Sequence, residues 1–160
     1  MKRIFVCVAV ASLFAASAAS ADTAWGLRGG MTFDPDQVHV GAHLEAGELF
    51  TQGYFVPNVE IGFGDDITTI AINPELIYRF LKRTRSDWGF YIGAGLGINH
   101  YSWDTPEGFN GDDSDTELGM NILGGMSRKL GSGNEFLVEL KLGVTDEMPD
   151  AKVTAGLTFF

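Results

Sequence analysis

The chain has 160 residues, of which 45% are hydrophobic, 12% aromatic and 20% charged. This length fits a single domain, and the apolar content is too high for a disordered chain. The 21 acidic residues outnumber the 11 basic ones and give a formal net charge of −10. Such a surface repels phosphate, so the composition argues against a nucleic-acid partner.

The N-terminus has the pattern of a signal peptide. Two basic residues precede an apolar stretch over 4–16, which is too short to span a bilayer. Small residues follow it, and Ala19-Ser20-Ala21 forms an A-x-A cleavage site. The sequence therefore predicts a cleaved leader over 1–21 and a mature domain over 22–160. The single cysteine, Cys7, lies in the leader, so no disulfide is expected in the mature domain.

The mature chain alternates between apolar and polar residues with a period of two. This is the pattern of half-buried strands, and no segment of comparable length shows the period of a helix. Turn-forming Asp, Gly and Pro residues separate the runs, which have about the length of a strand that crosses a bilayer at a tilt. In chain order, the predicted strands cover 25–33, 38–46, 55–63, 70–80, 88–99, 117–127, 136–144 and 152–159.

The hairpin around Asp65-Asp66 has a predicted register. If these two residues form the turn, Asn58 lies opposite Asn73, and Pro57 lies opposite Pro74. Proline has no N–H, so we expect the facing prolines at a non-hydrogen-bonded position, where neither N–H is needed.

Alternation alone leaves two kinds of barrel open. A soluble lipocalin-like barrel would turn its apolar face inward around a ligand, whereas a membrane barrel would turn it toward lipid. Glycines on the polar face, such as Gly93, Gly95 and Gly97, suit a crowded interior better than a solvated exterior. The sequence therefore favours a membrane barrel with a polar lumen.

Charges balance on the polar face, as a water-poor lumen requires, because an unpaired buried charge costs several kcal/mol. We predict that they form an ion-pair network that plugs the lumen. Its members are Arg28, Glu45, Glu60, Glu75, Arg79, Glu117, Lys129, Glu139, Lys141 and Lys152.

Aromatic residues cluster at the ends of the predicted strands, which is typical of the two girdles of a membrane barrel. One predicted girdle contains Trp25, Phe55, Tyr78, Phe80, Trp88, Phe136 and Phe159, and the other Phe33, Phe63, Tyr101 and Trp103.

The leader, the eight alternating runs and the C-terminal Gly156-Leu157-Thr158-Phe159-Phe160 together resemble small bacterial outer-membrane β-barrels of the outer-membrane-protein A/X type, within the porin-like superfamily. The resemblance implies an all-β, eight-stranded, antiparallel up-and-down transmembrane barrel in the bacterial outer membrane. It also implies outer-membrane lipid and lipopolysaccharide as neighbours, the barrel-assembly machinery as a partner during insertion, and a monomeric state.

In that family both chain ends lie in the periplasm, which would make the connections 34–36, 65–66, 104–115 and 146–150 external. All four are acidic, while basic residues gather near the opposite connections, at 82–85 and 128–129. The acidic loops are interpreted as solvated surface, and divalent-cation bridging to lipopolysaccharide phosphates is the alternative.

No metal or cofactor site is expected. The acidic run at 112–117 lacks the ligand order of a calcium-binding EF-hand loop. His39 and His43 share a strand face but lie about 13 Å apart along the strand, too far to share one metal ion.

His100-Tyr101-Ser102 resembles the His-x-Ser segment of outer-membrane lipid A deacylases, in which His and Ser act with a Glu. The alternative function is therefore a membrane-embedded acyl hydrolase with Ser102 as nucleophile, His100 as base and Glu117 as third member. His100 and Ser102 have the parity of the lipid-facing series, however, and Glu117 has that of the lumen series. The favoured hypothesis is a non-enzymatic barrel with a structural or surface-interaction role in the cell envelope.

Overall fold

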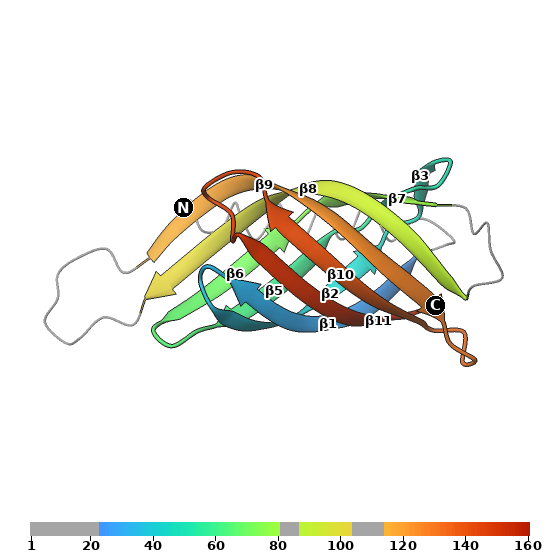
Figure 1. Ribbon diagram of the computed structural model, residues 1–160, viewed down its shortest axis with the longest axis horizontal. Helices are drawn as coiled ribbons and strands as arrows, with labels where there is room; N and C mark the ends of the chain where they lie inside the picture. Colours follow the sequence, from blue (N-terminus) through green and yellow to red (C-terminus); the bar gives the residue numbers. More distant parts are fainter. Residues whose placement is uncertain (1–22, 81–86, 104–113) are drawn as a thin grey trace, which may run out of the picture.

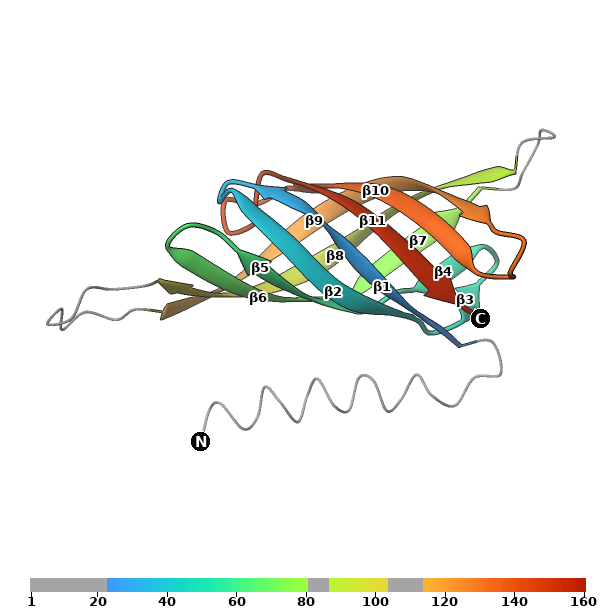
Figure 2. The ribbon, with the colours of Figure 1, turned by 90° about the horizontal axis from the view of Figure 1, so that it is seen from below.

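The structure is a computed structural model that describes residues 23–80, 87–103 and 114–160. Within these ranges the regular structure is one antiparallel β-sheet that closes on itself (Figures 1 and 2). This confirms the predicted eight-stranded antiparallel barrel. The predicted leader over 1–21 lies outside the described residues. No helix in the described part of the chain is long and apolar enough to cross a membrane.

Six of the eight barrel strands are continuous. They are β1 (Ala24–Phe33), β2 (Gln37–Glu45), β8 (Trp88–Trp103), β9 (Ser114–Lys129), β10 (Glu135–Gly143) and β11 (Ala151–Phe159). The third barrel strand is β4 (Gly53–Phe55) followed by β5 (Asn58–Phe63), and the fourth is β6 (Ile67–Asn73) followed by β7 (Glu75–Arg79). A short strand, β3 (Glu48–Phe50), extends the path of β2 and pairs with β4.

The barrel has up-and-down topology, in which each strand pairs with its neighbours along the chain. The first strand closes the ring because it pairs with both β2 and β11, and Arg28 lies between Gly41 and Gly156. The strands run at a tilt to the long axis of the barrel (Figures 1 and 2). The hairpin register is also as predicted, since Asn58 lies opposite Asn73.

The faces of the sheet are the reverse of those in a soluble barrel. Large apolar side chains point outward, with Leu118 62% and Met31 56% exposed, while Glu60 and Glu75 in the interior are each 1% exposed. The lipocalin-like alternative with an apolar lumen is therefore wrong.

Aromatic rings pair at the barrel end that carries the C-terminus. Ring centroids lie 4.8 Å apart in Trp25 and Phe159, and 6.3 Å apart in Trp88 and Phe136. The prediction for Tyr101 is wrong, because β8 continues past residue 99 and places this side chain on the inward face, where it is 6% exposed.

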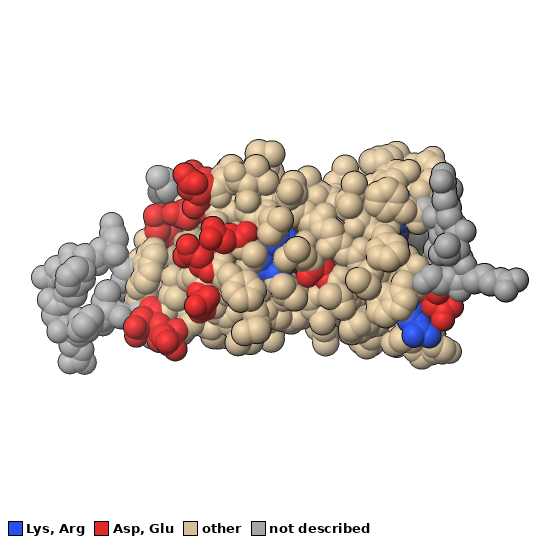
Figure 3. Space-filling model, in the orientation of Figure 1, with Lys and Arg blue, Asp and Glu red and all other residues tan. Residues whose placement is uncertain are grey.

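The two ends of the barrel differ in charge. Exposed acidic side chains gather at the end that holds the β1–β2, β5–β6 and β10–β11 connections (Figure 3). They are Asp34, Asp36, Asp65, Asp66, Asp115, Asp146, Glu147 and Asp150. The opposite end holds the β3–β4 hairpin and the β9–β10 turn (Figure 1).

Candidate functional site

A cluster of buried ion pairs lies inside the barrel, and we call it the central cluster. Its hub is Arg28 on β1, whose guanidinium lies 3.5 Å from Glu60, 3.2 Å from Glu139 and 3.9 Å from Glu75. Lys152 pairs with Glu60 at 2.9 Å, and Lys141 pairs with Glu75. Three bases and three acids from five strands therefore neutralise one another away from water.

Neutral side chains add hydrogen bonds to the central cluster. The Tyr91 hydroxyl donates to Glu139 at 3.1 Å, and the Asn58 amide donates to Glu75 at 2.8 Å. Asn73 in turn donates to Asn58 at 2.8 Å. Such shared partners make the cluster a unit, because removing one member leaves others buried and unpaired.

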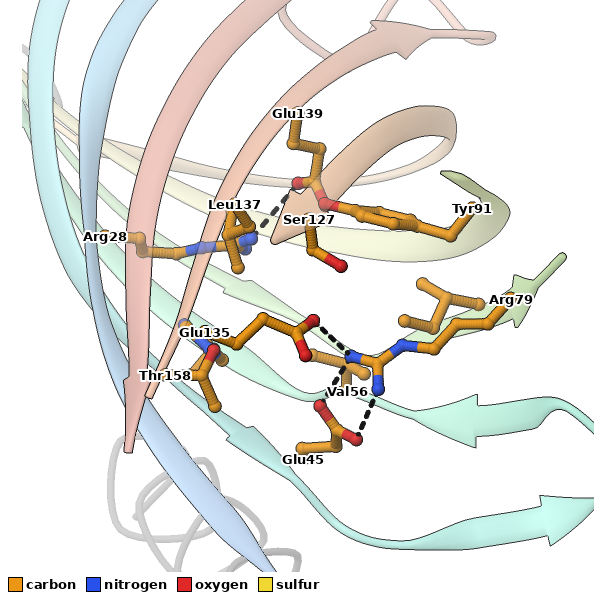
Figure 4. Close-up of a pocket in the computed structure, with 12 residues that line it drawn as sticks. Arg28, Glu45, Val56, Arg79, Tyr91, Ser127, Glu135, Leu137, Glu139 and Thr158 are labelled. Atoms are coloured by element: carbon orange, nitrogen blue, oxygen red, sulfur yellow. Dashed lines mark hydrogen bonds and ion pairs between the residues drawn. The ribbon is translucent and has the colours of Figure 1, made fainter. Parts of the chain in front are cut away.

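A second group, the mouth cluster, lies at the end of the lumen away from the acidic loops. Arg79 on β7 donates two hydrogen bonds to Glu45, at 2.9 and 2.7 Å, and lies 3.5 Å from Glu135 (Figure 4). Its guanidinium also stands 4.7 Å from the centre of the Tyr54 ring. Arg79 thus bridges carboxylates that come from well-separated strands.

An apolar layer separates the two clusters. Val56, Ile77, Leu123 and Tyr91 form one buried hydrophobic group inside the barrel. On β7, Ile77 lies between Glu75 of the central cluster and Arg79 of the mouth cluster. A cavity of about 20 Å³ remains beside this layer, lined by residues of both clusters (Figure 4).

The β10–β11 connection contacts the lumen face of the barrel at the acidic end. Its Met148 is 6% exposed, and the Asn99 amide donates to its thioether at 3.3 Å. The Met148 side chain lies where a Cβ at Gly97 or Gly119 would be, so these two glycines are needed for the close approach. The alternation of apolar and polar residues did not predict this contact.

Two predicted members of the network lie elsewhere. Lys129 is exposed at the mouth, with its ammonium 5.5 Å from the centre of the Phe160 ring. Glu117 is half-buried on β9 opposite Asn99, toward the acidic end. Conversely, Glu135 belongs to the mouth cluster and was missed, because the predicted strand began at residue 136. Glu135 lies an even number of residues before Glu139, so the alternation could have predicted that both face the lumen.

Two histidines lie on the lumen face of β2, and both are hydrogen-bonded to threonines. His39 contacts Thr32 at 2.9 Å and Thr154 at 3.0 Å, and His43 contacts Thr158 at 2.9 Å. Both histidines therefore link β2 to β11 across β1, and His39 also contacts β1 itself.

Similar proteins identify the architecture. No family model and no curated protein matches the sequence. Among solved structures, Neisserial surface protein A is 17% identical, with a TM-score of 0.56, over 85% of this chain and 94% of its own. The N-terminal β-barrel domain of Pseudomonas aeruginosa OprF is 15% identical, with a TM-score of 0.59, over 86% and 96%. The chain has the fold of a small outer-membrane β-barrel.

The outer membrane enzyme PagL shares this fold, at 13% identity and a TM-score of 0.50, over 86% of this chain and 99% of its own. In this barrel, His100 and Ser102 lie on the outward-facing series of β8, and His100 Nδ1 lies 2.8 Å from the Thr116 hydroxyl. Glu117 has the inward parity. The structure therefore brings His100 together with Thr116 and not with the carboxylate that the hydrolase hypothesis needs.

Proposed function

We propose that the protein is an integral barrel of the bacterial outer membrane, monomeric and exported through a cleaved leader, with a lumen closed to ions. Its role is structural or surface-interacting, and it needs no cofactor. The observation that carries the proposal is the charge-paired central cluster inside an apolar exterior.

The exterior supports a membrane location. Outward residues at mid-strand, such as Leu27, Val40, Ile92 and Ile122, are each at least 50% exposed and lie on strands all around the ring. A soluble monomer rarely exposes so continuous an apolar surface, whereas lipid chains remove it from water. The acidic end then faces outward among lipopolysaccharide head groups, and the barrel-assembly machinery carries out the insertion.

The interior supports closure. The lumen of an eight-stranded barrel is just wide enough for side chains to fill. An ion that enters this one meets Met148, then the central cluster, then the apolar layer at Ile77. Passage requires breaking buried ion pairs, which costs several kcal/mol.

Planar-bilayer recording tests the proposal. We expect no stable conductance steps from purified protein whose folded state is verified by heat-modifiable migration on gels. Regular porin-like steps would refute the closed lumen. Recovery of the native protein in the soluble fraction, with no heat-modifiable form, would refute the membrane location.

A further inference from the structure

The cavity of about 20 Å³ beside the apolar layer has polar residues of both clusters in its wall. Arg28 belongs to the central cluster and Arg79 to the mouth cluster, and their side chains reach the cavity from different walls of the barrel (Figure 4). A single buried water needs about 10–15 Å³. The cavity therefore has room for one water molecule and little more.

Three nitrogen atoms of the residues that line this cavity have no hydrogen-bond partner in the described part of the chain. They are Arg28 Nε, His43 Nδ1 and Arg79 Nε. The Arg28 side chain is 1% exposed and His43 is 4% exposed, so both lie away from bulk water. A buried polar atom without a partner is costly, and native structures rarely leave one so. The three atoms therefore point to a small polar molecule in the cavity.

The register of the barrel brings Arg28 and His43 close together on the lumen face. Arg28 of β1 lies opposite Gly41 of β2, and His43 of β2 lies opposite Gly26 of β1. The two residues are therefore diagonal neighbours on adjacent strands. The His43 ring occupies the space that a Cβ at Gly26 would take, so it leans over β1. Arg79 comes from β7, which is not a neighbour of either strand.

The surrounding charges favour a neutral molecule. Glu45, Glu135 and Glu139 also line the cavity and outnumber its two arginines, so an anion is repelled. A cation gains nothing from the two arginine Nε–H groups, because these groups can only donate hydrogen bonds. Water can accept from both of them and donate to His43 Nδ1. Three hydrogen bonds are also the usual number for a buried water.

We propose that this cavity binds one structural water, held by Arg28 Nε, His43 Nδ1 and Arg79 Nε. The water joins the central cluster to the mouth cluster past the apolar layer, and so makes the two clusters one polar network. The water site does not rest on the closed lumen proposed above, because it needs only the local contacts of these three residues.

NMR spectroscopy of the folded, isotope-labelled protein in detergent micelles tests this site. We expect cross-peaks between water and the Nε–H groups of Arg28 and Arg79, with opposite signs in nuclear and rotating-frame Overhauser spectra. Opposite signs identify a water that stays bound, whereas proton exchange with bulk water gives equal signs. Arg128 is the internal control, because it pairs with Asp87 at the exposed surface and should show no such cross-peak.

Ser127 also lines the cavity and offers a matched pair of variants. Ser127→Val fills the cavity with methyl groups, so we expect both cross-peaks to disappear. The midpoint of heat unfolding should fall by at least about 2 °C, because the three nitrogens lose their partner. Ser127→Ala leaves the space open and should keep both cross-peaks. Ser132→Val, in an exposed turn, repeats the same exchange away from the cavity and should change neither measurement.

The folded state of each variant is verified by heat-modifiable migration on gels. Absence of either cross-peak in the wild type would overturn the proposal, and so would cross-peaks that persist in folded Ser127→Val. A higher unfolding midpoint in Ser127→Val would also overturn it, because filling a dry cavity stabilises a protein. If Ser127→Val does not fold, the wild type and Ser127→Ala decide, and loss of the cross-peaks in Ser127→Ala would overturn the proposal.

Discussion

Pro57 and Pro74 lie directly opposite each other on the third and fourth strands of the barrel. The Asn58–Asn73 pair precedes them on one side, and on the other the Val56 N–H donates to the Glu75 carbonyl at 2.8 Å. The facing prolines therefore occupy a non-hydrogen-bonded position of this ladder.

Each proline still removes one hydrogen bond from the sheet, because both strands have a neighbouring strand on their other side as well. The Leu44 N–H donates to the Pro57 carbonyl at 2.9 Å, and the Leu96 N–H donates to the Pro74 carbonyl at 3.2 Å. Proline has no N–H with which to return either bond. The expectation that neither N–H is needed is thus correct for the pairing of the two strands with each other. It is wrong for the pairing of each strand with its neighbour on the other side. The breaks between β4 and β5 and between β6 and β7 fall at these prolines.

A disulfide tests this register. Opposed residues at a non-hydrogen-bonded position have Cα atoms about 4.5 Å apart, within reach of a disulfide. In a Cys7→Ser background we expect Pro57→Cys/Pro74→Cys to cross-link on mild oxidation, read as faster migration of the boiled, unreduced protein. The control Pro57→Cys/Ile72→Cys places the cysteines diagonally, about 7–8 Å apart, and should cross-link poorly. Stronger cross-linking in the control would mean that the register is wrong.

The faces and the hairpin register could be predicted because both follow from local rules. A period of two fixes which residues share a face, and a two-residue turn fixes every pair along the hairpin. The polar face is rich in glycine and glutamate, and neither residue type suits a lipid-facing position. Glu60 and Glu75 were therefore correctly predicted to face the lumen.

Contacts across the lumen could not be predicted in the same way. Met148 lies in a connection whose path the alternation does not describe, and its position depends on the space above Gly97 and Gly119. The apolar layer was missed because Ile77 and Leu123 have polar-series parity. The alternation predicts that these two side chains point inward, but it does not predict which side chains they contact across the lumen.

The Met148 contact gives a second prediction. A leucine in place of Gly97 would occupy the space of the Met148 side chain and displace the β10–β11 connection. We expect a destabilisation of about 1–3 kcal/mol from overpacking, and faster cleavage after Glu147 by a glutamate-specific protease. The control is Gly131→Ala, since open space surrounds that glycine. Unchanged cleavage in Gly97→Leu would show that Met148 does not hold the connection.

The hydrolase hypothesis gives a third prediction. Because Glu117 has inward parity while His100 and Ser102 face outward, we expect purified protein to release no fatty acid from lipid A in mixed micelles. Ser102→Ala should be indistinguishable from the wild type in this assay. Release by the wild type that Ser102→Ala abolishes would establish an enzyme and would require a partner for His100 other than Glu117.

The central cluster gives the fourth prediction, which concerns Glu75. This carboxylate pairs with Lys141, lies 3.9 Å from Arg28 and accepts a hydrogen bond from Asn58. Glu75→Ala therefore leaves Lys141 buried without its partner, and we expect a loss of about 3–5 kcal/mol in the free energy of unfolding. Asp65→Ala in an exposed turn should change it by less than about 0.5 kcal/mol.

A charge-neutral double variant shows whether the cost comes from the unpaired charge or from lost packing. Glu75→Leu/Lys141→Met removes both charges at similar volume, and replacing a buried pair in this way is often nearly neutral. We expect it to recover most of the stability that Glu75→Ala loses, measured by urea titration of the folded form on unboiled gels. If the double variant is as unstable as Glu75→Ala, packing around Glu75 sets the stability of the lumen, and charge pairing does not.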